Sequence, residues 1–232
     1  MNIYTVIPAR GGSKSIPKKN TQLLNGKPLV AYTIEYSLKC PWVTHTVVST
    51  DSEEIAEIAR SCGAEVPFMR PGELAQDDTP DYPVFRHALN TLEELCSEQI
   101  DVVVLLRPTS PLRPPRLIEK GIALLKRFSE ASSVRSMTLC KQHPFRQWKI
   151  NGEYMVGYEM EVFEAYNLPR QQLPSIYFQT GDLEIIRRQT LLNGSISGER
   201  ILPLIIKPEE VVDIDCISDW HKAEERLRRN KV

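Results

Sequence analysis

The sequence predicts a doubly wound α/β fold, in which a mostly parallel sheet is covered by helices on both faces. In the first half of the chain, apolar runs typical of buried strands alternate with segments of helical periodicity. The run at 102–106, Val-Val-Val-Leu-Leu, shows no polar alternation, which is expected in the middle of a parallel sheet. With 232 residues, 41% of them hydrophobic, the chain is long enough for one domain with a substantial core.

Four strand and helix pairs make up the first half. The strands are expected at 3–7, 43–49, 66–69 and 102–106, and the helices at 28–38, 53–62, 82–96 and 116–128. The third helix carries Phe85, Leu89 and Leu92 on one apolar stripe, as a helix packed on a sheet requires. Strands at 202–206 and 211–214 and a closing helix through Trp220 complete the expected order.

Residues 141–180 interrupt this pattern. They are irregular, contain prolines and are rich in aromatic side chains that need burial. Packing on a second copy of the chain would supply that burial, and so would folding as a flap over the chain's own core; the sequence leaves both open. We therefore predict a single domain over 1–232, with 141–180 as an inserted arm.

Charge and cysteine content exclude several classes of protein. The formal net charge is -1, which gives no support for binding nucleic acid or anionic lipid with the whole surface. We find no signal-peptide pattern and no run of about 18 apolar residues, so no membrane association is expected. The five cysteines are scattered without C-x-x-C spacing, which predicts reduced thiols, no structural zinc and a cytoplasmic location.

A basic loop with adjacent glycines, at 8–20, follows the first expected strand. Because Gly11 and Gly12 lack Cβ atoms, backbone N–H groups there can approach an anion closely. Positive charge comes from Arg10, Lys14 and Lys19. The segment matches neither the Walker motif nor the dinucleotide fingerprint, so we predict a polyphosphate-binding loop of another kind, in preference to a solvated basic loop.

An acidic doublet, Asp213 and Asp215, lies near the end of the last expected strand. Side chains at i and i+2 of a strand point to the same side, and a divalent cation would offset the repulsion between the carboxylates. Mg²⁺ is held typically by one or two carboxylates together with substrate phosphates. The alternative is that Asp215 only caps the closing helix, and the pattern alone does not decide between them.

Two further loops follow expected strands. The loop at 107–113, Arg-Pro-Thr-Ser-Pro-Leu-Arg, has prolines that fix its backbone and hydroxyls that can contact a ligand. Asp51 either accepts a hydrogen bond from a ribose or base, or caps the helix that begins near Ser52, and on its own the cap is favoured.

His143 is a weak candidate for substrate contact. No nucleophile elbow or Cys–His motif is present, so covalent catalysis is disfavoured.

The ordered set of these motifs resembles the acylneuraminate cytidylyltransferase family, the CMP-sialic acid synthetases, which are related to the CMP-Kdo synthetases. The resemblance spans residues 3 to about 225 and rests on 8–20, 49–51 (Ser-Thr-Asp), 70–75 (Arg-Pro-Gly-Glu-Leu-Ala), 108–113, 169–174 (Pro-Arg-Gln-Gln-Leu-Pro) and 213–215. It implies a nucleotide-diphospho-sugar transferase-like fold and an enzyme that transfers CMP from CTP to the anomeric hydroxyl of a nonulosonic acid, releasing pyrophosphate. Mg²⁺ as cofactor and a homodimer with shared active sites are also implied.

The resemblance further implies roles for individual residues. The catalytic residues would be Arg10, Lys19 and Asp215. The nucleotide would be bound by Ala9, Arg10, Gly11, Gly12, Ser13, Lys14, Lys19, Asn20, Arg70 and Asp77. The metal would be held by Asp213 and Asp215. The sugar acceptor would be bound by Arg107, Thr109, Ser110, Arg146, Arg170 and Thr180.

Two departures from the family pattern concern the acceptor. Arg107 stands where family members usually have Gln, and 180–185 reads Thr-Gly-Asp-Leu-Glu-Ile where sialic acid synthetases typically read Asn-Gly-Ala-Ile-Tyr-Ile. An added cation and two added carboxylates change what a buried pocket tolerates, so legionaminate, pseudaminate and Kdo-like acids stay open as acceptors beside N-acetylneuraminate.

The alternative function is that of an enzyme acting on a sugar phosphate or phosphonate, with CTP or another nucleoside triphosphate. An idle nucleotide-binding module is disfavoured, because it would not need the acidic doublet.

Overall fold

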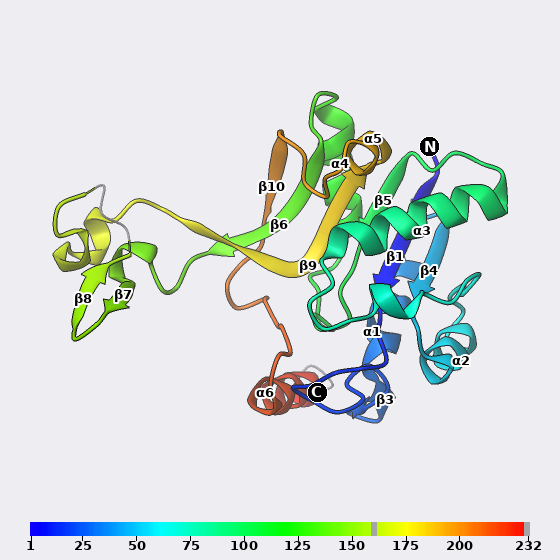
Figure 1. Ribbon diagram of the computed structural model, residues 1–232, viewed down its shortest axis with the longest axis horizontal. Helices are drawn as coiled ribbons and strands as arrows, with labels where there is room; N and C mark the ends of the chain where they lie inside the picture. The colour runs from blue at the N-terminus through cyan, green and yellow to red at the C-terminus, as the bar shows by residue number, and fades with distance from the viewer. Residues whose placement is uncertain (159–161, 230–232) are drawn as a thin grey trace.

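A six-stranded sheet forms the centre of the computed structural model, which describes residues 1–158 and 162–229 (Figure 1). Across the sheet the strands follow the order β10 (Ile201–Ile205), β6 (Ser133–Leu139), β9 (Tyr177–Arg187), β5 (Val102–Leu105), β1 (Ile3–Pro8) and β4 (His45–Ser49). β9 runs antiparallel to both of its neighbours, and the other adjacent pairs run parallel. The sheet is therefore mostly parallel, as predicted.

Helices cover both faces of this sheet. One face packs against α1 (Leu29–Leu38), α2 (Glu53–Ser61) and α4 (Leu117–Arg127), and the other against α3 (Asp81–Cys96) and α5 (Arg188–Leu192). Successive residues of the central strands contribute to the two cores in turn: Ile3 and Ile7 lie in the first, and Tyr4 and Val6 in the second. The doubly wound architecture is confirmed.

A third, smaller core lies below the loop that follows β1. Here α6 (Ile217–Arg229) packs through Trp220 against Ile16 and Leu29, close to the short pair β2 (Leu23–Leu24) and β3 (Lys27–Pro28). Figure 1 shows α6 beside this early segment, although the two are at opposite ends of the chain. The closing helix therefore supports the basic loop.

The predictions of strands at 66–69 and 211–214 were wrong. At the edge of the sheet, Glu65 forms one isolated bridge with Val47, and Pro67 lacks the N–H that would continue the pairing. Residues 211–214 leave the sheet and follow an irregular path toward the loop after β5. Strands β6 and β9 were not predicted, because apolar and polar residues alternate in β6 and because β9 begins inside the expected arm.

The arm extends away from the sheet on the long β6–β9 ribbon (Figure 1). It contains the hairpin of β7 (Trp148–Asn151) and β8 (Tyr154–Gly157) and the 3₁₀ turns η2 (Pro144–Arg146), η3 (Ala165–Asn167) and η4 (Arg170–Gln172); a further turn, η1 (Gly72–Leu74), lies outside the arm. Large apolar side chains of the arm are open to solvent, with Ile150 85% and Phe163 88% exposed. The arm is thus not folded back over the chain's own core. Within the described ranges, no helix is long and apolar enough to cross a membrane.

Arg113 joins three parts of the fold from a buried position. Its Nε donates to the carbonyl of Asp182 at 2.6 Å, its Nη1 to the Thr33 hydroxyl at 2.9 Å, and its Nη2 to the carbonyl of Arg107 at 2.5 Å. Burial lowers the pKa of Arg113 to about 10. The guanidinium therefore ties α1 and β9 to the loop after β5, which forms one wall of the site described below.

Replacing Arg113 by Gln is expected to lower the free energy of unfolding by about 3 kcal/mol or more, because each buried acceptor left without a donor costs about 1–3 kcal/mol. Urea denaturation measures the change. The matched control is Arg116→Gln, since the Arg116 side chain is 79% exposed. Equal stability of the two variants would show that the buried hydrogen bonds contribute nothing.

Candidate active site

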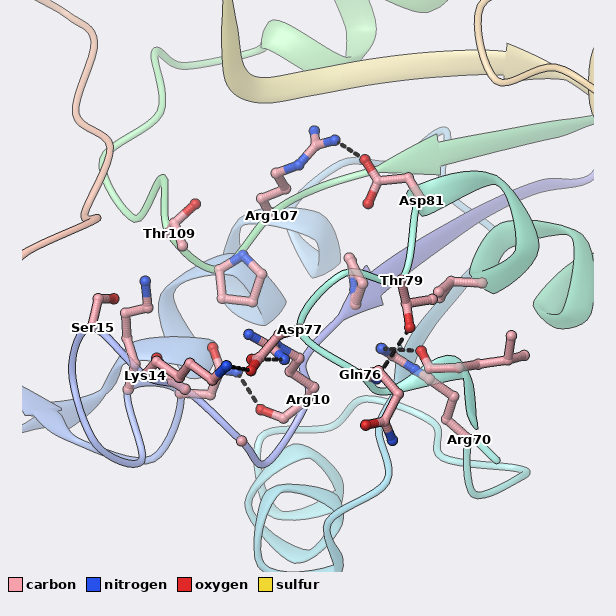
Figure 2. A pocket seen from close by; sticks show the side chains of 18 residues that line it. Arg10, Lys14, Ser15, Arg70, Gln76, Asp77, Thr79, Asp81, Arg107 and Thr109 are labelled. Atoms are coloured by element: carbon pink, nitrogen blue, oxygen red, sulfur yellow. Dashed lines mark hydrogen bonds and ion pairs between the residues drawn. The ribbon is translucent and has the colours of Figure 1, made fainter. Parts of the chain in front are cut away.

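A cavity of about 470 Å³ opens at the carboxyl ends of β1 and β5 (Figure 2). Ligands of open α/β sheets bind at this edge. Ten of the predicted site residues line the cavity: Arg10, Gly12, Ser13, Lys14, Lys19, Asn20, Arg70, Asp77, Arg107 and Thr109. The wall is completed by Pro8, Ser15, Leu74, Gln76, Thr79, Asp81, Val84 and Pro108.

The loop after β1 is held in shape by its own hydrogen bonds. The Asn20 side chain donates from Nδ2 to the carbonyl of Arg10 at 2.9 Å, and Ala9 donates through its backbone N–H to the Ser49 carbonyl at 2.9 Å. Ala9 is fully buried and does not line the cavity. These bonds present the Arg10, Lys14 and Lys19 side chains to the cavity.

Gly11 and Gly12 have different roles. The Gly11 N–H donates to Oδ1 of Asp51 at 2.9 Å, and a Cβ on Gly11 would lie 2.9 Å from the Cβ of Ser52, so only glycine fits. Gly12 lines the cavity, and a Cβ there would meet nothing within 4 Å. Asp51 therefore fastens the loop. The prediction that Asp51 caps α2 was wrong. The cap is Ser52, whose hydroxyl accepts a hydrogen bond from the N–H of Ile55 at 3.5 Å.

Asp77 lies among the cations of the basic loop. Its carboxylate pairs with Nη1 of Arg10 at 2.5 Å and with Nζ of Lys14 (Figure 2). Hydrogen bonds from Lys14 and then Arg10 lower the pKa of Asp77, so it is ionised at neutral pH. A phosphate group entering the loop would compete with Asp77 for these two side chains.

Arg70 braces the opposite wall. It is 6% exposed, and its Nε and Nη2 donate to the hydroxyl and carbonyl of Ser49 at the end of β4. Burial lowers the pKa of Arg70 to about 10. Its Nη1 donates to the carbonyl of Leu74 at 3.5 Å, so each of its three nitrogens bonds within the protein and Arg70 fixes the wall.

The acidic doublet lies next to the basic loop. Nζ of Lys19 donates to the carbonyl of Ile214 at 3.0 Å, and the N–H of Ile214 donates to the carbonyl of Thr109 at 2.8 Å. The Ile214 side chain is buried in the core below the loop. The three segments that carry Lys19, Thr109 and the doublet therefore meet at one residue.

The donors of the doublet fit a divalent cation that is completed by a substrate. Loss of hydration raises the pKa of Asp213; a hydrogen bond from Thr109 opposes the rise and the charge of Asp215 adds to it. A cation would relieve this repulsion. Within 1–158 and 162–229, no group of three or more His, Cys, Asp or Glu could hold a metal alone. Asp213 and Asp215 suit Mg²⁺ only together with phosphate oxygens.

The predicted acceptor residues are divided between three places. Arg107 and Thr109 line the cavity, whereas Ser110 and Thr180 are buried and outside its lining. The Thr180 hydroxyl donates to the Ser136 hydroxyl at 2.8 Å.

Arg146 and Arg170 lie in the arm, where with Lys141 and His143 they line a second cavity of about 320 Å³. Within one chain, these two arginines are not brought to the first cavity. Their role toward the sugar stays a prediction.

Several residues of the site were not foreseen from the sequence. Asp81, the first residue of α3, and Glu184, in the middle of β9, both contact Arg107, and Gln76 and Thr79 line the same wall. Glu184 was noted as a departure from the family pattern but was given no partner. No local pattern links positions so far apart in the chain.

Comparison with known proteins gives the family. Residues 4–194 match the family model described as cytidylyltransferase. The chain belongs to this family. The resemblance to nucleotidyltransferases found in the sequence is thereby confirmed, and the protein is an enzyme of that class.

Relatives of known name match this cytidylyltransferase over its whole length or nearly so. It is 36% identical over 237 residues to the CMP-N,N'-diacetyllegionaminic acid synthase of Legionella pneumophila subsp. pneumophila. The match covers 100% of this chain and 98% of that protein. It is 31% identical over 235 residues to the N-acylneuraminate cytidylyltransferase of Escherichia coli O18:K1:H7, covering 99% of this chain and 54% of that protein. Among solved structures, a CMP:2-keto-3-deoxy-manno-octonic acid synthetase complexed with CTP shares the fold, with a TM-score of 0.74, 16% identity and coverage of 99% and 100%.

Replacing Asp77 by Asn is expected to strengthen the binding of inorganic pyrophosphate roughly threefold to tenfold, because the anion that competes for Arg10 and Lys14 is neutralised. Isothermal titration calorimetry measures the dissociation constant. Asp78→Asn, one residue along the same loop, is the control. Weaker pyrophosphate binding in the Asp77 variant would show that this carboxylate helps to hold the ligand instead of competing with it.

Proposed function

We propose that the cytidylyltransferase uses CTP and Mg²⁺ to transfer CMP to the anomeric hydroxyl of a nonulosonic acid, with release of pyrophosphate. The observation that carries this proposal is the meeting of the basic loop and the acidic doublet, where Lys19 donates to the carbonyl between Asp213 and Asp215 at 3.0 Å. Asp213 and Asp215 are outside the cavity lining, but they flank a residue that bonds to Lys19 and Thr109, both of which line the cavity, so carboxylates for the metal lie next to cations for a triphosphate. The names of the curated relatives support CTP and a nine-carbon sugar acid as substrates.

Binding of the nucleotide is assigned to the first cavity. Arg10, Lys14 and Lys19 would hold the triphosphate, together with the backbone around Gly12 and the Ser13 hydroxyl. Asn20 would meet the nucleoside, and Arg70 and Asp77 would lie nearby on the facing wall. Asp213 and Asp215 would hold Mg²⁺, which when bound neutralises phosphate charge.

The chemical step is an attack of the acceptor hydroxyl on the α-phosphorus of CTP. Such a transfer asks the protein mainly for positioning and for stabilisation of developing charge. Arg10 and Lys19 would stabilise the charge that grows on the leaving pyrophosphate. Asp215, which is exposed, would take the proton of the attacking hydroxyl.

The acceptor is assigned to the end of the cavity formed by Arg107 and Thr109. The similarity over full length to a diacetyllegionaminic acid synthase favours an acid of that kind, with acetamido substituents, over an eight-carbon acid. We place the reaction in the cytoplasm, where CTP is available; the five cysteines are all unpaired.

The arm is proposed to form a homodimer with shared active sites. Ile150, Tyr154 and Phe163 are 85%, 79% and 88% exposed, which is unusual for large apolar side chains on one projecting element. Burial against a second copy would remove this surface from water. Arg146 and Arg170 would then reach the acceptor end of the other subunit's cavity.

The reaction is tested by pyrophosphate release with each of the four nucleoside triphosphates against a panel of keto-sugar acids and sugar phosphates. We expect turnover with CTP and a nine-carbon acid that stops when Mg²⁺ is chelated. In this assay Lys19→Met is expected to lower kcat by about 10²–10³, because a preorganised cation is lost.

Lys18→Met is the matched control, because Lys18 pairs with Glu54 on the surface at 2.8 Å and does not line the cavity. Turnover with GTP or UTP only would contradict the use of CTP. A Lys19 variant as active as the Lys18 variant would remove Lys19 from the mechanism.

The dimer is tested with the double variant Ile150→Asp, Tyr154→Asp. We expect the wild-type enzyme to sediment as a dimer at micromolar concentration and the variant as a monomer, because charges would be buried without partners in the interface. The monomer should also lose turnover, since it would lack the arm arginines of a second subunit. A monomeric wild-type enzyme with full activity would contradict the shared site.

A further inference from the structure

Arg107, at the acceptor end of the cavity, is already held by two carboxylates. Its Nη1 donates to Oε1 of Glu184 at 2.8 Å, and its Nη2 pairs with Asp81 (Figure 2 shows the second contact). Glu184 also receives Nη2 of Arg135 on its other oxygen at 2.5 Å. The guanidinium is therefore fixed in position by neighbours on α3 and β9.

The charges in this group balance. Arg107 and Arg135 are matched by Asp81 and Glu184, so the network carries no net formal charge. Glu184 is 5% exposed, which keeps its interaction with Arg107 largely out of water. The other end of the cavity differs, because there Arg10 and Lys14 share a single acid, Asp77, and Lys19 donates to a backbone carbonyl.

A neutralised arginine is a poor site for a carboxylate. An acid brought to Arg107 would be dehydrated there and would face Glu184 and Asp81, which repel it. The guanidinium has five N–H groups, and the described residues accept from two of its nitrogens, so N–H donors are left for a ligand. Asp81 is 43% exposed at its side chain and can accept a hydrogen bond beside them. Donor and acceptor together suit a hydroxyl or an amide.

We propose that Arg107, positioned by Glu184, selects the sugar acid by its neutral hydroxyl or acetamido substituents and does not bind its carboxylate. This inference rests on the proposed function and makes Arg107 a specificity-determining residue and Glu184 a positioning residue. It also explains how Arg107 and one of the two added carboxylates, Glu184, can be introduced together: they pair with each other, so this pair adds a hydrogen-bonding surface and no net charge.

The first test compares two acceptor acids that differ only at one carbon, where one has an acetamido group and the other a hydroxyl. For Arg107→Gln we expect the ratio of their kcat/KM values to change by about tenfold or more, with the KM for CTP unchanged, since a hydrogen bond to one substituent is lost. Arg60→Gln is the control, because Arg60 pairs with Glu53 on the exposed surface of α2 and does not line the cavity. An equal loss for both acids would overturn the proposal, because the carboxylate is what they share.

The positioning role of Glu184 is tested in the same assay. Glu184→Gln is expected to shift the acceptor ratio in the same direction as Arg107→Gln, and the double variant to shift it no further than the larger single change. If Glu184→Gln folds poorly, Asp81→Asn takes its place, because it removes the other carboxylate that holds Arg107 and Asp81 is more exposed than Glu184. Independent, additive effects of the two substitutions would overturn the positioning role.

A binding measurement separates this proposal from the proposed function. Inorganic phosphate is titrated while the melting temperature is followed, in wild type, Arg107→Gln, Glu184→Gln and the double variant. We expect wild type and Arg107→Gln to respond alike, and Glu184→Gln to gain an extra phosphate-dependent rise that the double variant lacks. A smaller response in Arg107→Gln than in wild type would show that Arg107 already binds anions. If the wild-type enzyme turned over no sugar acid with CTP, the proposed function would fail. The phosphate titration would still show whether Arg107 is available to bind an anion.

Discussion

The site depends on the way in which Ile214 is held. Its N–H is bound by the carbonyl of Thr109, its carbonyl by the ammonium group of Lys19, and its side chain by the core below the first loop. Lys19 and Ile214 are 195 positions apart in the sequence. Because Asp213 and Asp215 flank this residue, the same contacts that bury one apolar side chain bring two carboxylates to the loop that carries the cations. Asp213 and Asp215 themselves lie in neither a strand nor a helix, so the contacts of Ile214 are what place them.

Electrostatics divide the cavity into two ends. At the β1 end, Arg10 and Lys14 share one acid, Asp77, and Lys19 bonds to a backbone carbonyl, so positive charge is left on the basic loop. At the β5 end, Arg107 and Arg135 are matched by Asp81 and Glu184. Under the proposed function, an anionic nucleotide and the polar, uncharged part of a sugar would thereby be directed to different walls. The arm, with its own cationic cavity around Arg146 and Arg170, supplies charge at a third position.

Much of the fold followed from the sequence, because periodicity and loop chemistry are local. The run at 102–106 indicated a central strand, and β5 is buried on both faces. The basic loop was recognised from its composition, and it lines the cavity. The wrong predictions concern segments whose state is decided by distant neighbours: 211–214 is apolar enough for a strand, but its pairing partners are Thr109 and Lys19 in two loops. The Arg107–Glu184 pair spans 77 positions, and no local pattern contains it.

The most direct measurement is a crystal structure of the enzyme with a CTP analogue that cannot be cleaved and Mn²⁺ in place of Mg²⁺, using the anomalous signal of the metal. The convergence at Ile214 predicts one manganese peak that touches both the Asp213–Asp215 doublet and a phosphate oxygen, with Lys19 on the same triphosphate. A triphosphate bound on the basic loop with the metal elsewhere, or with the doublet turned away from it, would contradict a shared site for the two segments.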